Sequence, residues 1–267
     1  MTKNYNILIT NDDGIESPGL KAAVEAVMDI GSVSVIAPTL QQTASGRALT
    51  GNRQSSLQPI PYKANGKKIS AYHCECSPAL IVKHSLKTLF NGSKIDLLVS
   101  GINYGENLGV NITSSGTVGA ALEAACSGIP SIAISQQTDI ESHFKYTDQD
   151  WTTSAFFLNK FAKVLLKNEL PQDVDVLKID VPASATPLTH WKMTNLSKTD
   201  YYSRVFDHPA ENSKLSDGKT IIQLQKEDLD REGDIYVFAV ERLVAVTPLS
   251  VDLTSRVNIK DLKSTIE

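Results

Sequence analysis

The sequence predicts an α/β fold in which helices cover both faces of a mostly parallel sheet. Two observations predict it: short apolar runs alternate along the chain with helix patterns, and several of these runs end in polar loops rich in small residues. A chain of 267 residues can also bury a full hydrophobic core without disulfides or a structural metal.

The first 135 residues supply most of the predicted elements. Four short apolar runs indicate buried strands, at residues 7–10, 33–37, 95–99 and 131–135. Three segments indicate helices. Residues 18–30 have an amphipathic pattern, residues 77–90 begin with Ser-Pro, which suits the first turn of a helix, and residues 117–127 are rich in Ala. Between them, Asn65-Gly66 predicts the turn of a hairpin within residues 58–76.

The second half of the chain is less regular. Residues 148–167 carry apolar side chains along one side and predict a long helix. Three further strands are predicted, at residues 174–181, 236–240 and 243–247. Residues 182–234 are polar and Tyr-rich with few sustained patterns, and residues 251–267 form a polar tail of weak helical character.

Composition and charge restrict the function. Lys plus Arg number 26 and Asp plus Glu 30, a net charge of −4 without a basic stripe, so nucleic-acid binding is not expected. The sequence shows neither a membrane-spanning run nor a signal peptide, and no membrane partner is expected. The cysteines, Cys74, Cys76 and Cys126, form no disulfide framework, which predicts reduced thiols in a cytoplasmic protein.

A pair of adjacent carboxylates follows the first predicted strand, where ligands bind in an open α/β sheet. Asp12 and Asp13 repel each other unless a positive charge lies beside them. One interpretation is a divalent cation held by oxygen ligands, to which Thr43 and Asn103 in neighbouring loops would add. Such ligands favour Mg²⁺ or Mn²⁺ over Zn²⁺. The alternative is an Asx turn in which Asp13-Gly14 reverses the chain and Asp12 is solvated.

The loop before residues 117–127 suggests an anion site. Ser115 or Thr117 can cap the predicted helix, and Gly116 allows another group to approach the backbone. The free N–H groups and the helix dipole would then favour a phosphate. The alternative is an ordinary capped helix whose small residues pack against the sheet.

Other common motifs are absent. The sequence contains no P-loop, no G-x-G-x-x-G after the first strand and no G-x-S-x-G elbow. The five histidines lack H-x-x-x-H spacing, so each is expected at the surface or in packing. Gly101, Gly105 and Gly109 indicate either a loop pressed on a ligand or a tight backbone path.

Several motifs in order resemble those of the SurE family, survival proteins that are metal-dependent nucleoside monophosphate phosphatases. The matching segments are Ile9-Thr10-Asn11-Asp12-Asp13-Gly14 with Pro18-Gly19, Ala37-Pro38 with Gly46 and Thr50, residues 100–109 (SGINYGENLG) and residues 115–121 (SGTVGAA). Val246-Thr247-Pro248-Leu249 with Asp252 is similar to the family's closing segment.

The resemblance implies a single SurE-like domain over residues 1–267 with a doubly wound, Rossmann-like core. The core would cover about residues 1–183, and a C-terminal oligomerisation region about residues 184–267. Elements of that region would exchange between the subunits of a homodimer or homotetramer. Within it, the stretch from about residue 195 to 231 would be either a subunit-exchanged hairpin or a mobile flap.

For the site, the resemblance implies one divalent cation per subunit, bound by Asp12, Asp13, Thr43 and Asn103, with Ser45 as a nearby alternative to Thr43. The expected catalytic residues are Asp12, Asp13 and Asn107, and the expected substrate-binding residues are Asn11, Asn107, Ser115, Gly116 and Thr117. The implied activity is hydrolysis of nucleoside monophosphates to nucleoside and phosphate, with the 5′ or 3′ position of the ester left open.

The sequence departs from the family pattern in places. Thr43 stands where the family usually has Ser, Arg47 where His is common, and Lys178 and Asp180 lie in a strand where Asn is favoured. These departures bear on substrate preference more than on reaction type. One alternative function is a non-catalytic nucleotide- or anion-binding module with a degenerate metal site. A phosphatase with a D-x-D nucleophile is disfavoured, because Asn11 takes the nucleophile's position.

Overall fold

The computed structural model describes residues 4–267 and places most of them around one central sheet. The strands are β1 (Tyr5–Thr10), β2 (Gly31–Pro38), β3 (Gln58–Pro59), β4 (Tyr62–Ala64), β5 (Lys67–Cys74), β6 (Leu97–Tyr104), β7 (Ser131–Gln136), β8 (Val176–Val181), β9 (Trp191–Met193), β10 (Tyr202–Val205), β11 (Lys219–Ile222) and β12 (Val244–Leu249). The α-helices are α1 (Pro18–Val27), α2 (Pro78–Lys87), α3 (Gly116–Ala125), α4 (Thr152–Lys167), α5 (Asp234–Ala239) and α6 (Ile259–Ile266).

The centre of the sheet is parallel and doubly wound. Strands β5, β2, β1, β6, β7 and β8 lie side by side in this order, and each pair is parallel. The chain runs outward from β1 to β2 and then returns to place β6 on the other side of β1. The predicted α/β class is confirmed, and the reversal at β1 creates a switch point where ligands bind in such sheets. Beyond β8, β12 is antiparallel.

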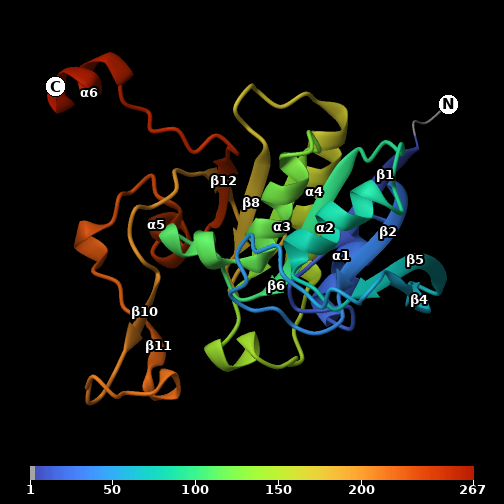
Figure 1. The fold of residues 1–267 in the computed structure, drawn as a ribbon, viewed down its shortest axis with the longest axis horizontal. Helices are drawn as coiled ribbons and strands as arrows, with labels where there is room; N and C mark the ends of the chain where they lie inside the picture. Colours follow the sequence, from blue (N-terminus) through green and yellow to red (C-terminus); the bar gives the residue numbers. More distant parts are fainter. Residues whose placement is uncertain (1–3) are drawn as a thin grey trace.

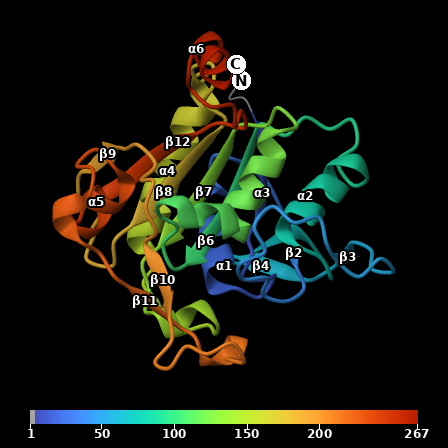
Figure 2. The ribbon, with the colours of Figure 1, turned by 60° about the vertical axis from the view of Figure 1, so that its left-hand side comes forward.

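Two hydrophobic layers enclose this sheet (Figures 1 and 2). Ile7 and Ile9 of β1 pack into the cluster that contains apolar residues of α1 and α4. Leu8, which lies between them, packs into the opposite cluster with residues of α2 and α3. The alternation follows from the period of two in a β-strand, and burial on both faces explains why the run is continuously apolar.

Most predicted elements are present with shifted ends. The predicted hairpin turn is confirmed, because Asn65 and Gly66 both have positive φ, 44° and 74°, between β4 and β5. The strand predicted at 95–99 begins later and continues to Tyr104, so Asn103 belongs to β6 rather than to a following loop.

The predicted strand at residues 236–240 is wrong, because these residues lie mainly in helix α5. Their β-branched and aromatic side chains favour a strand locally. The buried residues of α5 are nevertheless spaced as on a helix, at Asp234, Ile235, Val237 and Phe238. Packing of this short helical face has overridden the local preference.

The C-terminal region extends away from the sheet. β10 and β11 pair antiparallel as a two-stranded hairpin, which lies at the lower left of Figure 1. Helix α6 lies at the end of the exposed tail and has no buried residue. Of the two expectations for residues 195–231, the structure shows a hairpin, and its exchange between subunits stays a prediction.

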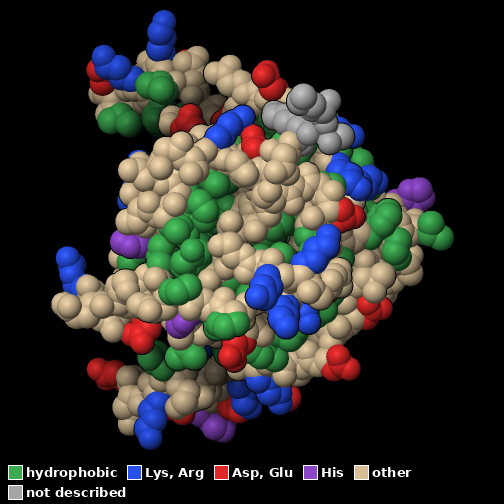
Figure 3. All heavy atoms as spheres, turned by 90° about the vertical axis from the view of Figure 1, so that its right-hand side faces the viewer, with side chains coloured by type: hydrophobic (Ala, Val, Ile, Leu, Met, Phe, Trp, Pro, Cys, Tyr) green, Lys and Arg blue, Asp and Glu red, His purple; other side chains and the backbone are tan. Residues whose placement is uncertain are grey.

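Charges on the surface are mixed. Lys and Arg side chains are interspersed with Asp and Glu on the face shown in Figure 3. None of the helices in residues 4–267 is both long and apolar enough to cross a bilayer.

Candidate functional site

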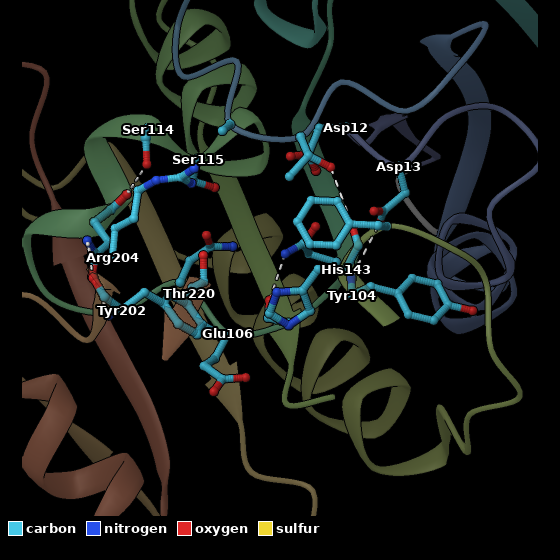
Figure 4. A pocket seen from close by; sticks show the side chains of 17 residues that line it. Asp12, Asp13, Tyr104, Glu106, Ser114, Ser115, His143, Tyr202, Arg204 and Thr220 are labelled. Carbon is cyan, nitrogen blue, oxygen red and sulfur yellow. Dashed lines mark hydrogen bonds between the residues drawn. The ribbon is translucent and has the colours of Figure 1, made fainter. Parts of the chain in front are cut away.

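A cavity of about 410 Å³ opens at the switch point of the sheet (Figure 4). Six residues predicted from the sequence line it, namely Asp12, Asp13, Thr43, Asn103, Asn107 and Ser115. Asp12 and Asp13 lie on one side of the cavity, and the hairpin residues Tyr202, Arg204 and Thr220 lie on the other. Three predicted residues, Asn11, Gly116 and Thr117, are adjacent to the cavity wall without lining it.

The turn after β1 is shaped by Asn11. The side-chain amide of Asn11 donates to the carbonyl of Gly14, and the N–H of Gly14 donates back to the Asn11 side chain, at 3.0 and 3.2 Å. Gly14 has a φ of 101°, which an L side chain rarely adopts. The Asx-turn interpretation therefore applies to Asn11, whereas Asp12 is buried and not solvated.

Asp12 is held by the start of helix α3. The hydroxyl of Thr117 donates to Asp12 Oδ1 at 2.5 Å. Burial raises the pKa of Asp12, and hydrogen bonds from the Thr117 hydroxyl and from backbone groups at Gly116 and Thr117 act in the opposite direction. The free N–H groups at the start of the helix thus bind a carboxylate of the protein itself, that of Asp12. Ser115, rather than Thr117, caps the helix by accepting from the N–H of Val118.

Asp13 is held by two neighbouring loops. Its Oδ1 accepts from the side chain of Gln41 at 3.0 Å, and its Oδ2 accepts from the N–H of Tyr104 at 3.2 Å. Burial raises the pKa of Asp13 well above its usual value, and the charge of Asp12 raises it further. Two buried carboxylates side by side are costly unless protons or a cation neutralise them.

The chemistry of these donors fits a hard divalent cation. In residues 4–267, no cationic side chain lowers the pKa of Asp12 or Asp13. The amide nitrogen of Asn103 donates to the carbonyl of Gly105 at 2.6 Å, so its oxygen is the atom available to a ligand. No described cluster offers three or more His, Cys, Asp or Glu ligands, so a cation here would depend on two carboxylates and neutral oxygens.

Two hydroxyl groups, those of Thr43 and Ser45, are candidates for the neutral hydroxyl ligand of such a cation. Thr43 is exposed, lines the cavity and donates a long hydrogen bond of 3.4 Å to the carbonyl of His143. The hydroxyl of Ser45 is buried and has no hydrogen-bond partner among the described residues. A Cβ placed on Gly116 would lie 2.6 Å from Ser45 Oγ and 2.8 Å from Asp12 Oδ2. Both hydroxyls therefore stay candidates.

The loop that follows β6 also contributes to the cavity wall. Asn107 lines the cavity and donates from its side-chain amide to the hydroxyl of Ser135 at 2.8 Å. The backbone path is tight here, because a Cβ on Gly105 would lie 2.2 Å from His143 Nε2 and one on Gly101 the same distance from the carbonyl oxygen of Ile134. The tight-path interpretation of these glycines is confirmed.

Sequence reasoning missed a segment that covers the Asp pair. The Tyr146 hydroxyl donates to the carbonyl of Asp13 at 2.7 Å, and the carbonyl of His143 accepts from Gln41 at 2.8 Å. The imidazole of His143 packs against Gly105 in the cavity wall, and burial lowers its pKa. This segment is distant in sequence from the residues that it contacts, so no local pattern predicted it. Gly105, against which His143 packs, was the one residue of the contact that the sequence singled out.

Comparison with known proteins gives one consistent result. The family model described as "Survival protein SurE" matches residues 7–203. A "5′-nucleotidase SurE" of Thermococcus kodakarensis is 37% identical over 97% of this chain and 98% of its own length. The protein of the same name from Thermococcus gammatolerans is 39% identical over 97% of this chain and 95% of its own length. The crystal structure of a SurE protein from Aquifex aeolicus superimposes with a TM-score of 0.76 at 28% identity, covering 98% of this chain and all (100%) of that one.

Proposed function

The chain belongs to the SurE family, and from this premise we propose that it is a hydrolase of nucleoside monophosphates, which it cleaves to nucleoside and phosphate in a metal-dependent reaction. Its curated relatives are named 5′-nucleotidases. The observation that carries the proposal is the buried pair Asp12 and Asp13, which lines the cavity. Burial raises the pKa of both carboxylates, and neither has a cationic partner among the described residues.

One divalent cation, Mg²⁺ or Mn²⁺, would be held by Asp12, Asp13 and Asn103, together with the hydroxyl of Thr43 or Ser45. When bound, such a cation neutralises charge on a transferring phosphoryl group and makes water a better nucleophile. Within the chain, Thr117 and Gln41 each donate to one carboxylate of the pair. These bonds fix the carboxylates before any ligand arrives, which reduces the reorganisation that the reaction needs.

The substrate would lie between the two sides of the cavity. Asn107 and Ser115 line it and offer a side-chain amide and a hydroxyl to phosphoryl oxygens. Asn11, Gly116 and Thr117 would act on the substrate through Asp12 and the turn that carries it, since their own polar groups are engaged there. The net charge of −4 supports a small substrate rather than a nucleic acid.

A homodimer or homotetramer is part of the same proposal. Helix α6 is exposed along its whole length, and it presents Ile259, Leu262 and Ile266 to solvent. An amphipathic helix without a packing partner of its own favours association with a second copy. The three free cysteines are consistent with cytoplasm as the proposed compartment.

The test is release of inorganic phosphate from a panel of 5′- and 3′-nucleoside monophosphates, after chelation and after addition of Mg²⁺ or Mn²⁺. Release that metal restores and that Asp13→Asn abolishes is expected, and the panel ranks the esters. Arg231→Gln changes an exposed side chain that does not line the cavity, so it serves as the control variant and is expected to turn over normally. Nucleotide binding without release under any metal would overturn the proposal in favour of a binding module.

A further inference from the structure

A buried ion network lies directly behind Asn107. Lys178 and Asp180 are two residues apart on β8, and their side chains are 1% and 0% exposed. Lys178 Nζ lies 2.5 Å from Asp180 Oδ2 and 3.0 Å from Asp234 Oδ2. Asp234, at the start of α5, is also fully buried. The network thus joins the sheet to the C-terminal region through three charges.

Both polar groups of the Asn107 backbone are bonded to this network. The N–H of Asn107 donates to Asp180 Oδ1 at 2.7 Å, and its carbonyl accepts from Lys178 Nζ at 2.9 Å. Asp234 Oδ2 accepts from the N–H of Gly109, two residues further along the loop, at 3.1 Å. The loop that enters the cavity is therefore held from behind by its peptide groups.

Such a network needs a reason, because burying three charges costs more than an apolar core of the same volume. Burial lowers the pKa of Lys178, but the charges of Asp180 and Asp234 outweigh this effect and leave its pKa raised. The ammonium group stays charged, and a charged donor makes the stronger hydrogen bond to the Asn107 carbonyl.

We propose that Lys178 and Asp180 are positioning residues for Asn107, holding its peptide so that its side chain keeps its place in the wall of the cavity that Asp12 and Asp13 also line. This inference rests on the proposed function, in which Asn107 contacts the phosphoryl group. Misplacement of a reacting or binding group by about 1 Å can cost on the order of 100-fold in rate. The pair acts on turnover through geometry, without touching the substrate.

The first experiment compares Lys178→Met with Asp234→Asn. Lys178→Met removes the donor to the Asn107 carbonyl. Asp234→Asn weakens the other arm of the network and the acceptor of the Gly109 N–H, but it leaves both bonds to Asn107 itself. We expect Lys178→Met to lower kcat about ten-fold or more with KM changed little, and Asp234→Asn to keep kcat within about two-fold, although both lower the melting temperature. Equal effects of the two variants on kcat would overturn the inference.

A double-mutant cycle distinguishes positioning from general damage. In an Asn107→Ser background, Lys178→Met is expected to have no further effect on kcat, since the side chain that it positions has gone. Independent losses that multiply would contradict the inference. If Lys178→Met does not fold, Asp180→Asn is tested instead. The amide of the new Asn has one oxygen, which cannot accept from both the Asn107 N–H and Lys178 as the two carboxylate oxygens do. Lys178 still pairs with Asp234 in this variant. At least about a three-fold loss of kcat is then expected.

Hydrogen exchange gives a readout that does not depend on activity. The amides of residues 105–109 are expected to exchange slowly in the wild-type protein and faster in Lys178→Met. Fast exchange in the wild type would overturn the inference whatever the activity. If the wild type releases phosphate normally and Lys178→Met does too, only the inference fails. If the wild type releases none from any nucleotide, the proposed function fails first and the inference with it.

Discussion

The hydroxyl of Thr117 donates a 2.5 Å hydrogen bond to the carboxylate of Asp12, across 105 residues of sequence. It ties the first residue of the carboxylate pair to the first turn of α3. This carboxylate is thus oriented by a side chain whose own position is fixed by a helix in the core.

Thr117→Val keeps the shape of the side chain and removes only the hydroxyl. Asp12 then loses its side-chain donor, and kcat is expected to fall about ten-fold, the scale of one misaligned electrostatic group. Thr117→Ser, which restores the hydroxyl, is the matched control and is expected to recover most of the rate. Steady-state kinetics with a fixed, saturating metal concentration checks both. A Val variant as active as the Ser variant would show that this bond does not orient Asp12.

Gly116→Ala is expected to damage the site, although Ala favours helices. The added Cβ would lie 2.6 Å from Ser45 Oγ, 2.7 Å from Asp12 Cβ and 2.8 Å from Asp12 Oδ2. Overpacking of this kind costs about 1–3 kcal/mol of stability. Metal-dependent activity and the midpoint of urea unfolding should therefore both fall. An Ala variant with wild-type values in both measurements would mean that the helix start can shift freely.

The two candidate hydroxyls can be separated by metal titration. Thr43 lines the cavity, so Thr43→Ala is expected to raise the Mn²⁺ concentration for half-maximal activity by about ten-fold, and Thr43→Ser to lower it. Ser45→Ala is the paired variant, since the Ser45 hydroxyl is buried beside Asp12 without a partner. A larger shift for Ser45→Ala than for Thr43→Ala would assign the ligand to Ser45.

Glu106 predicts a pH dependence of stability. Burial raises its pKa to about 7 from 4.5, and the charge of Asp180 adds to the rise, whereas the hydrogen bond from Tyr201 acts against it. A carboxyl whose pKa is raised on folding binds more protons in the folded state, so stability falls as the pH rises from about 4.5 to about 7. Glu106→Gln removes this loss and keeps an acceptor for Tyr201.

Urea unfolding of the wild type and of Glu106→Gln at several pH values measures the effect. The Gln variant is expected to gain stability over the wild type progressively between pH 5 and about pH 7, after which the difference is constant. The opposite trend, with the wild type gaining as the pH rises, would show that a cation stabilises Glu106 in the folded protein.

The parts of the fold that local sequence describes well are those buried on both sides of the sheet. The run at Ile7-Leu8-Ile9 predicted a buried strand, and in the structure its alternate side chains pack into two different cores. The same reasoning failed at residues 236–240, where β-branched and aromatic side chains form a short helix because of what they pack against. Local propensity is informative where it agrees with packing, and only there.

The residues of the site likewise fall into those that the sequence could predict and those that it could not. Asp12, Asp13 and Asn103 were predictable, because parallel strands bring polar residues to one edge of the sheet. Asn107 was expected only from the family resemblance. The roles of Lys178 and the segment around His143 were not, since their partners lie far away in the sequence and no local pattern marks them. Such partners become visible only when the contacts are known.

The contacts that complete the cavity have a consequence for synthesis on the ribosome. Asp13 accepts a hydrogen bond from the N–H of Tyr104, 91 residues downstream. The N–H of Gly109 donates to the carboxylate of Asp234, 125 residues downstream. A nascent chain that has emerged as far as the parallel sheet therefore already contains the donors to Asp12 and Asp13, but it still lacks the acceptor for Gly109. We expect this cavity loop to be fully held only after the segment that begins α5 has left the exit tunnel.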